Sequence, residues 1–165
     1  MTDKRPFPYR AVLVAAASAL AVAAIGGSLT TIGPWYRALH KPAWTPPDAA
    51  FGAIWTLIFA LATVSGVTAW RGARSQSHRE WLIGLFALNG FLNILWSLLF
   101  FRLERPEWAL IEAAPFWLSI AALIVFISRL SRLGSVLMAP YLVWVSIAIV
   151  LNYDIVHLNP PFGVR

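Results

Sequence analysis

Five long apolar runs, separated by short polar segments, constrain the fold of this 165-residue chain more than any other feature. They are residues 11–32, 49–70, 81–101, 108–127 and 136–153. Each has about 20 residues, the length of a helix that crosses a hydrocarbon layer of roughly 30 Å. None alternates polar and apolar residues with period two, so strands are not expected. The sequence therefore predicts an all-α integral membrane protein, a single domain over residues 1–165 built as a bundle of five transmembrane helices.

Composition and charge exclude several classes of protein. Hydrophobic residues make up 59% of the chain and charged residues only 12%, far from the averages of soluble proteins. The net charge of +6 does not indicate nucleic-acid binding, because Lys and Arg stand at the ends of the apolar runs, beside lipid headgroups. There is no Cys, and His40, His78 and His157 lie in separate polar segments, so no metal site is expected. No Ser-His-Asp set, phosphate loop or carboxylate pair is present either.

The distribution of basic residues predicts the orientation in the membrane. If the five runs cross in turn, one side collects eight basic residues: Lys4, Arg5, Arg10, Arg71, Arg74, Arg79, Arg129 and Arg132. The other side has five: Arg37, Lys41, Arg102, Arg105 and Arg165. Because the more basic side stays inside, we expect the N-terminus inside and the C-terminus outside.

The segment 35–47, WYRALHKPAWTPP, is the one long polar and proline-rich interruption, and we call it the lid. Its three prolines remove backbone donors and fix φ, so we expect extended and turn structure rather than a helix. It also carries Trp35, Tyr36 and Trp44 within ten positions. Amphipathic rings favour a membrane interface or the edge of a pocket. Two interpretations therefore stand, an aromatic anchor at the interface and a loop that covers a pocket.

Polar and aromatic residues of all five runs gather in the outer half of the predicted bundle. At 1.5 Å per residue, Trp55 lies about 9 Å, Asn93 about 12 Å and Trp96 about 8 Å below the outer boundary. Gly26, Gly27, Glu112 and Asn152 fall in the same half. The lid is on the same side of the membrane, so this region is the predicted pocket.

Helical phase places these residues on shared faces. The faces are Trp55, Phe59, Thr63 and Gly66 on the second helix, Asn89, Asn93, Trp96 and Phe100 on the third, and Tyr141, Trp144 or Val145, Ala148 and Asn152 on the fifth. Amides are costly in lipid, so Asn89, Asn93 and Asn152 are expected to point inward. They can do so as ligand-binding groups or as hydrogen-bonded links between helices, and both interpretations stand.

Glu112 is the one acidic residue inside an apolar run. An ionisable group within a membrane is by default a candidate for function. It lies only about a turn from the interface, so a structural role is the alternative, in which it reaches the headgroups or pairs with Arg102 or Arg105.

Small residues recur every fourth position in the first run, at Ala15, Ala19, Ala23 and Gly27. Such a stripe allows the backbone of another helix to approach closely. The partner is either a second subunit, which we favour, or a helix of the same bundle.

Three motifs in order resemble those of one membrane-protein family. They are W-Y-x-x-L-x-K-P-x-W-x-P-P at 35–47, N-x-x-W-x-x-x-F-F at 93–101 and P-Y-L-x-W-x-x-x-A-x-x-L-N at 140–152. Together they are similar to the tryptophan-rich sensory protein family, also called the translocator protein or peripheral benzodiazepine receptor family. The resemblance spans almost the whole chain.

The resemblance implies a five-helix bundle that forms a homodimer and binds porphyrins such as protoporphyrin and haem, with no obligatory cofactor. In bacteria it implies a role in tetrapyrrole regulation, so a bacterial cell membrane is the expected location. Some members bind cholesterol or benzodiazepine-type ligands, and some promote light-dependent breakdown of protoporphyrin.

Carried over by position, the family's pocket uses Tyr36, Pro46, Trp55, Phe59, Asn93, Trp96, Trp144 and Ala148. Porphyrin breakdown would involve Trp55 and Trp144. Two residues depart from the family pattern, since Phe59 replaces a frequent Tyr and Asn89 a frequent Gln. The sterol-recognition pattern lacks a Lys or Arg soon after Tyr153, which argues against strong sterol binding through it.

A flat macrocycle suits such a site. Its faces can stack on indoles while its carboxylates reach Arg37, Lys41 or amides of the lid, below Trp35 and Trp44. Three functions of different class follow: a tetrapyrrole-binding sensor or regulator, a porphyrin transporter, and a photo-oxidative porphyrin-degrading enzyme. Transport would predict an internal repeat, and none is present at these spacings.

Overall fold

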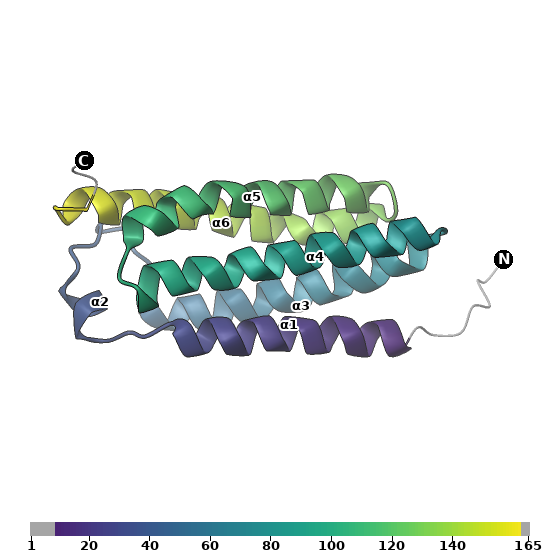
Figure 1. Ribbon diagram of the computed structural model, residues 1–165, viewed down its shortest axis with the longest axis horizontal. Coiled ribbons are helices and arrows are strands. Elements are labelled where there is room, and N and C mark those ends of the chain that lie inside the picture. Colours follow the sequence, from purple (N-terminus) through teal and green to yellow (C-terminus); the bar gives the residue numbers. More distant parts are fainter. Residues whose placement is uncertain (1–8, 163–165) are drawn as a thin grey trace.

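The computed structural model describes residues 9–162, and all regular structure within them is helical. The elements are α1 (Tyr9–Leu29), α2 (Pro34–Ala38), α3 (Asp48–Gly72), α4 (Gln76–Ser97), the π-helical turn η1 (Leu98–Arg102), α5 (Pro106–Ser128) and α6 (Arg132–Leu158). Five of the helices, with η1 counted as the end of α4, are long and apolar enough to span a membrane. They run side by side as one bundle (Figure 1). The predicted all-α fold with five spans is confirmed.

The two ends of the bundle differ in what they carry. At one end, the lid end, α2 lies beside the start of α3 and the end of α6 (Figure 1). At the other, the basic end, α3, α4, α5 and α6 meet in two short turns. The basic end has Arg10, Arg71, Arg74, Arg79, Arg129 and Arg132, and the lid end has Arg37, Lys41, Arg102 and Arg105. Lys4, Arg5 and Arg165, which also entered the predicted charge asymmetry, lie outside the described residues.

Several helices extend beyond their apolar runs. α4 begins at Gln76 and α6 spans Arg132–Leu158, whereas the sequence predicts 81 and 136–153 as the limits. Each extension at the basic end has a serine cap, since Ser75 Oγ accepts from His78 N–H (3.2 Å) and Ser131 Oγ accepts from Gly134 N–H (3.0 Å). Hydropathy marks only the stretch that lies in hydrocarbon, so it misses polar turns that continue a helix into water.

The structure of the lid differs in its first part from the predicted extended and turn structure. Residues 35–38 are helical, because Pro34 stands at the first position of α2, where the missing N–H of proline costs no hydrogen bond. From Leu39 the chain leaves the helix, and Thr45 N–H donates to the Pro42 carbonyl in a turn (3.0 Å). The expectation of extended and turn structure therefore holds only for the second part of the lid.

α1 lies at the edge of the bundle, and it packs against α3 and α4. Only Gly26 of this helix is fully buried. Ala15, Ala19 and Ala23 of the small-residue stripe are half-buried and Gly27 is exposed, and Ala23 and Gly27 line a partly open cavity. The bundle thus covers the stripe only in part, and the homodimer stays a prediction.

The core at the basic end depends on close helix approach at Gly134. A Cβ there would lie 2.7 Å from Thr68 Oγ1 and 2.9 Å from Ile127 Cγ2. The adjoining carbonyl of the same glycine accepts a buried hydrogen bond from Ser65 Oγ (2.7 Å). α6 therefore contacts α3 here without room for a side chain.

We predict that Gly134→Ala destabilises the protein by about 1 to 3 kcal/mol through overpacking. Gly84→Ala is the matched control, because a Cβ at Gly84 has no atom within 4 Å. It should leave stability unchanged or raise it, since Ala is the better helix former. The free energy of unfolding, measured by SDS titration in mixed micelles, checks both. Equal stability of the two variants would contradict the packing at Gly134.

Candidate ligand-binding site

A cavity of about 370 Å³, partly open to the outside, lies in the half of the bundle toward the lid end. Every helix contributes to its wall: Val22, Ala23, Gly26, Gly27, Thr30 and Ile32 from α1 and its end, Tyr36 from α2, Asp48, Phe51, Gly52 and Trp55 from α3, Asn93, Trp96, Ser97 and Phe101 from α4 and η1, Ala113 and Phe116 from α5, and Trp144, Val145, Ala148 and Ile149 from α6. The lining is predominantly apolar and aromatic, as in small-molecule pockets.

Three tryptophans from three helices line the cavity, and other rings hold them in place. Trp55 stacks on Phe59 with centroids 5.5 Å apart, and Trp96 stacks on Phe100 at 5.0 Å. Trp144 meets the edge of a fourth ring, Phe51, at 5.6 Å. Because these neighbours fix the indoles, the cavity presents preformed aromatic surface to a ligand.

A directed chain of hydrogen bonds links the cavity to the backbone of α5. Ser119 Oγ donates to the Phe116 carbonyl (2.7 Å), and Asn89 Nδ2 donates to Ser119 Oγ (2.8 Å). Tyr141 Oη then donates to Asn89 Oδ1 (3.1 Å), and Asn93 Nδ2 donates to Tyr141 Oη (3.4 Å). A carbonyl can only accept, so the direction of every bond in the chain follows from its Phe116 end. Asn93 is the last member of this chain, and its Oδ1, on the cavity wall, accepts no hydrogen bond from the other members.

Charged groups of both signs stand at the lid end of the cavity. Lys41 Nζ lies 3.7 Å from the centroid of the Tyr36 ring, a cation–π contact. Asp48, at the start of α3, is part of the cavity wall. Burial of Tyr36, and secondarily the negative charge of Asp48, raise the pKa of the Tyr36 hydroxyl. We call this lid end of the cavity its mouth. An anionic group of a ligand there would be repelled by Asp48 as well as attracted by Lys41.

The lid is tied to the end of α6. Asn159 pairs with both backbone groups of His40: its Oδ1 accepts from His40 N–H (2.8 Å) and its Nδ2 donates to the His40 carbonyl (2.8 Å). Trp44 Nε1 donates to Asp154 Oδ2 (3.2 Å). These bonds hold the middle of the lid across the bundle end.

The structure brings together six of the predicted ligand-binding residues on the cavity wall: Tyr36, Trp55, Asn93, Trp96, Trp144 and Ala148. Seven others are not part of the wall: Arg37, Lys41, Trp44, Pro46, Phe59, Asn89 and Asn152. Phe59 lies behind Trp55, Asn89 belongs to the hydrogen-bonded chain, and Trp44 is 46% exposed. Phe59 and Asn89 thus support residues of the wall instead of facing the cavity, and the ligand-binding role of all thirteen stays a prediction.

Asn152 has a structural position that its predicted place at the helix end did not suggest. α6 continues to Leu158, so Asn152 lies inside the bundle and is fully buried. With its amide oriented to satisfy both groups, Nδ2 donates to the Pro106 carbonyl and Oδ1 accepts from Leu110 N–H, each at 3.1 Å. Of the two interpretations of this amide, the link between helices describes what it does, since it joins α6 to the first turn of α5.

Glu112 neither reaches the interface nor forms the predicted ion pair. Its side chain is buried, and neither carboxylate oxygen has a hydrogen-bond partner within residues 9–162. Arg105 pairs instead with Glu107, Nε to Oε1 at 2.7 Å. Among the described residues no three His, Cys, Asp or Glu side chains gather as metal ligands.

Sequence reasoning missed the acidic and phenyl groups of the wall: Asp48, Phe51, Phe101 and Phe116. Phe51 could have been found, because it lies one turn before Trp55 and thus on the same face of α3. Phe101 could not, because η1 changes the helical phase after Ser97.

Comparison with known proteins gives consistent matches along the chain. The family model described as the TspO/MBR family matches residues 12–158. The "Tryptophan-rich protein TspO" of Chlorobaculum tepidum is 36% identical over 147 residues, 83% of this chain and 90% of that protein. The "Tryptophan-rich sensory protein" of Cereibacter sphaeroides is 32% identical (81% and 82% covered), and the "Translocator protein" of Sus scrofa is also 32% identical (72% and 71% covered).

We predict that Tyr141→Phe destabilises the protein by about 0.5 to 2 kcal/mol, because it leaves the amides of Asn89 and Asn93 without a shared partner. Tyr153→Phe is the control, since Tyr153 lies on the same helix but is 50% exposed. SDS-titrated unfolding measures both. A Tyr141 variant as stable as the Tyr153 variant would show that the chain contributes nothing.

Proposed function

Because this chain belongs to the TspO/MBR family of multi-pass integral membrane proteins, we propose that it is a tetrapyrrole-binding sensory or regulatory protein. Protoporphyrin or haem would occupy the cavity under the lid. The name of the Cereibacter sphaeroides relative, a sensory protein, supports the regulatory part of this proposal.

One observation carries the proposal: Trp55, Trp96 and Trp144, from three different helices, line a single cavity. Flat indole rings offer stacking surface to a flat aromatic macrocycle, and their held positions reduce the entropy lost on binding. The carboxylates of the ligand would extend to the mouth near Lys41.

Light-dependent breakdown of the bound porphyrin is the second candidate, and the positions of Trp55 and Trp144 favour it over transport. Both indoles line the cavity, where a light-excited ligand would contact them as electron donors. The titratable side chains of the wall are Asp48 and Tyr36, and both lie at the mouth of the cavity. Acid–base chemistry on the bound ring therefore has no part in this proposal. Many transporters bind their substrate where membrane helices are interrupted. Within the described spans, the irregular points are only the η1 turn and the internal prolines Pro115 and Pro140. Illumination of the loaded protein with and without oxygen, followed by the Soret band, separates degradation from binding alone.

We also propose the orientation that the basic residues predict, in a bacterial cell membrane. The basic end would face inside, and the lid end and its cavity outside. The cavity would then receive its ligand from the outer side or from the outer part of the bilayer.

We predict that protoporphyrin quenches tryptophan emission with micromolar affinity, and that replacing both Trp55 and Trp144 with Phe weakens this quenching at least severalfold. The control replaces Trp81 and Trp108, which are 62% and 50% exposed and are not part of the wall. Fluorescence titration in detergent measures each variant against its own unquenched emission. If the two double variants lose affinity equally, the assigned pocket is wrong.

A second prediction concerns the mouth. The parent protein should bind protoporphyrin up to about thirtyfold more tightly than its dimethyl ester, since the two exposed charge pairs contribute only about 0 to 1 kcal/mol each. Arg37→Gln together with Lys41→Gln should abolish this preference. Asp48→Asn should enlarge it by removing the opposing charge. A preference for the free acid that survives in the Arg37 and Lys41 variant would place the carboxylates elsewhere.

A further inference from the structure

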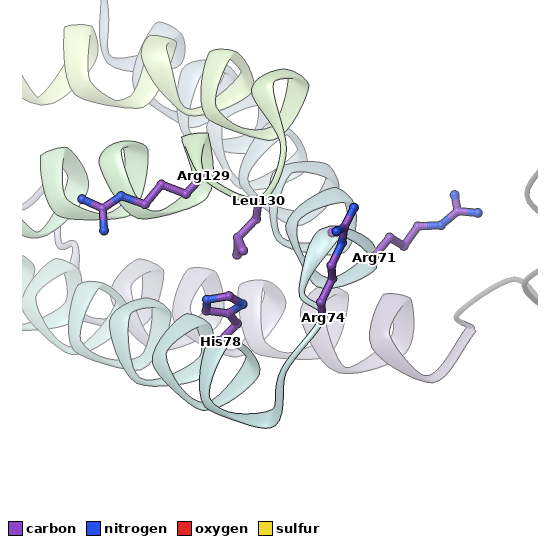
Figure 2. A pocket seen from close by; sticks show the side chains of 6 residues that line it. Arg71, Arg74, His78, Arg129 and Leu130 are labelled. Atoms are coloured by element: carbon purple, nitrogen blue, oxygen red, sulfur yellow. The ribbon is translucent and has the colours of Figure 1, made fainter.

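A second hollow, of about 430 Å³, lies at the basic end, far from the cavity already described. Its lining is Arg71, Gly72, Arg74, His78, Arg129 and Leu130, and we call it the basic hollow. These residues come from the end of α3, the start of α4 and the turn after α5 (Figure 2). Two segments that are distant in sequence, residues 71–78 and 129–130, thus contribute basic side chains to one hollow.

The backbone at Gly72 holds these segments together. A Cβ at Gly72 would lie 2.1 Å from the Leu130 carbonyl oxygen, so only glycine allows the end of α3 to touch the turn after α5. On the other side, the His78 ring meets the edge of Phe126 with centroids 6.3 Å apart. These contacts bring the end of α3 and the start of α4 against the end of α5 and the turn after it, so the backbone positions of Arg71, Arg74 and Arg129 lie at one place on the bundle end.

The charge of the basic hollow is not balanced by its own wall. Three of its six lining residues are arginines and none is acidic. Glu80 is the one acidic residue near this end within residues 9–162, and it accepts a hydrogen bond from Gln76 Nε2 (3.0 Å). In Figure 2 the side chains of Arg71 and Arg129 extend away from the hollow to either side, and Arg74 and His78 lie between them. Three arginines and a histidine that can turn toward one hollow match a group that carries several oxygen acceptors and negative charge, which describes a phosphate.

Membrane topology alone does not require this arrangement. Arg10 and Arg132 lie at the same end, are exposed, and serve the positive-inside rule without lining the hollow. Arg71 and Arg129 extend to either side of Arg74 and His78 (Figure 2), and their long, rotatable side chains can fold over an anion. Trp81, which is 62% exposed, places this level of the bundle at the edge of the hydrocarbon.

We propose that the basic hollow binds a phosphate group, and that an anionic phospholipid of the surrounding membrane supplies it. The guanidinium groups would bind the phosphate, and the acyl chains would lie against the apolar outer faces of α4 and α5. This site is independent of the proposed porphyrin function, because it shares no residue with the cavity wall.

The test uses the full chain in a neutral maltoside detergent and three probes: dihexanoyl phosphatidylglycerol, dihexanoyl phosphatidylcholine and inorganic phosphate. Thermal unfolding followed by tryptophan emission gives an apparent Kd from the rise in Tm with probe concentration. We expect phosphatidylglycerol to raise Tm, phosphatidylcholine to have little effect, and inorganic phosphate to act only at much higher concentration. Equal action of phosphate and phosphatidylglycerol would retain the phosphate site but overturn the lipid as its source, and no rise with either would overturn the proposal.

Arg74→Gln with Arg129→Gln should weaken phosphatidylglycerol binding about tenfold to thirtyfold, since each basic residue near a membrane surface contributes roughly 1 kcal/mol. Arg10→Gln with Arg132→Gln removes the same charge from the same end outside the hollow and should change the Kd less than threefold. Equal losses in the two double variants would show a general surface potential and overturn the site. Protoporphyrin quenching should be the same in both, which separates this result from the pocket at the lid end.

Discussion

A membrane interior offers no water to polar groups, and this constraint accounts for most of the architecture. The backbone meets it by forming helices. The side chains meet it within the bundle, through the chain of bonds from Asn93 through Tyr141, Asn89 and Ser119 to the Phe116 carbonyl. Because that chain joins α4, α5 and α6, the same bonds that satisfy buried amides also set the helix positions around the cavity. The polar character of the cavity wall is therefore a by-product of how the helices are held together.

The lid and the last helix form a second unit. α6 continues past its apolar stretch, and this extension supplies Asp154 and Asn159 to the lid. The two bonds between Asn159 and the backbone of His40 resemble the pairing of adjacent strands, with a side-chain amide in place of a second backbone. Movement of the lid would have to break them, so the position of the lid is linked to the end of the chain's last helix.

The sequence predicted the fold and much of the cavity because both depend on simple periodicities. Run length gave the number of spans, and helical phase placed Trp55, Asn93, Trp96 and Trp144 on inward faces that the structure brings together. The sequence did not predict the role of a side chain where that role depends on residues that are neighbours only in space. Asn89 and Asn152 had the same features as Asn93, yet their partners on α5 and α6 remove them from the wall. Glu112 is buried without the predicted arginine, since Arg105 has a nearer acid in Glu107.

The π-helical turn Leu98–Arg102 adds one residue to the end of α4, where Leu103 N–H donates to the Leu98 carbonyl (2.9 Å). It lets two consecutive rings face inward: Phe100 is buried against Tyr36, Leu151 and Ile155, and Phe101 lines the cavity. In a regular helix neighbouring side chains diverge by about 100°. The extra residue thus works as a phase shifter, and the rotational setting of α4 relative to the lid end depends on the count of residues here rather than on their identity. Loss of any one of them would leave composition and hydropathy nearly unchanged but would restore a regular helix, in which Phe100 and Phe101 diverge by about 100° and cannot both face inward.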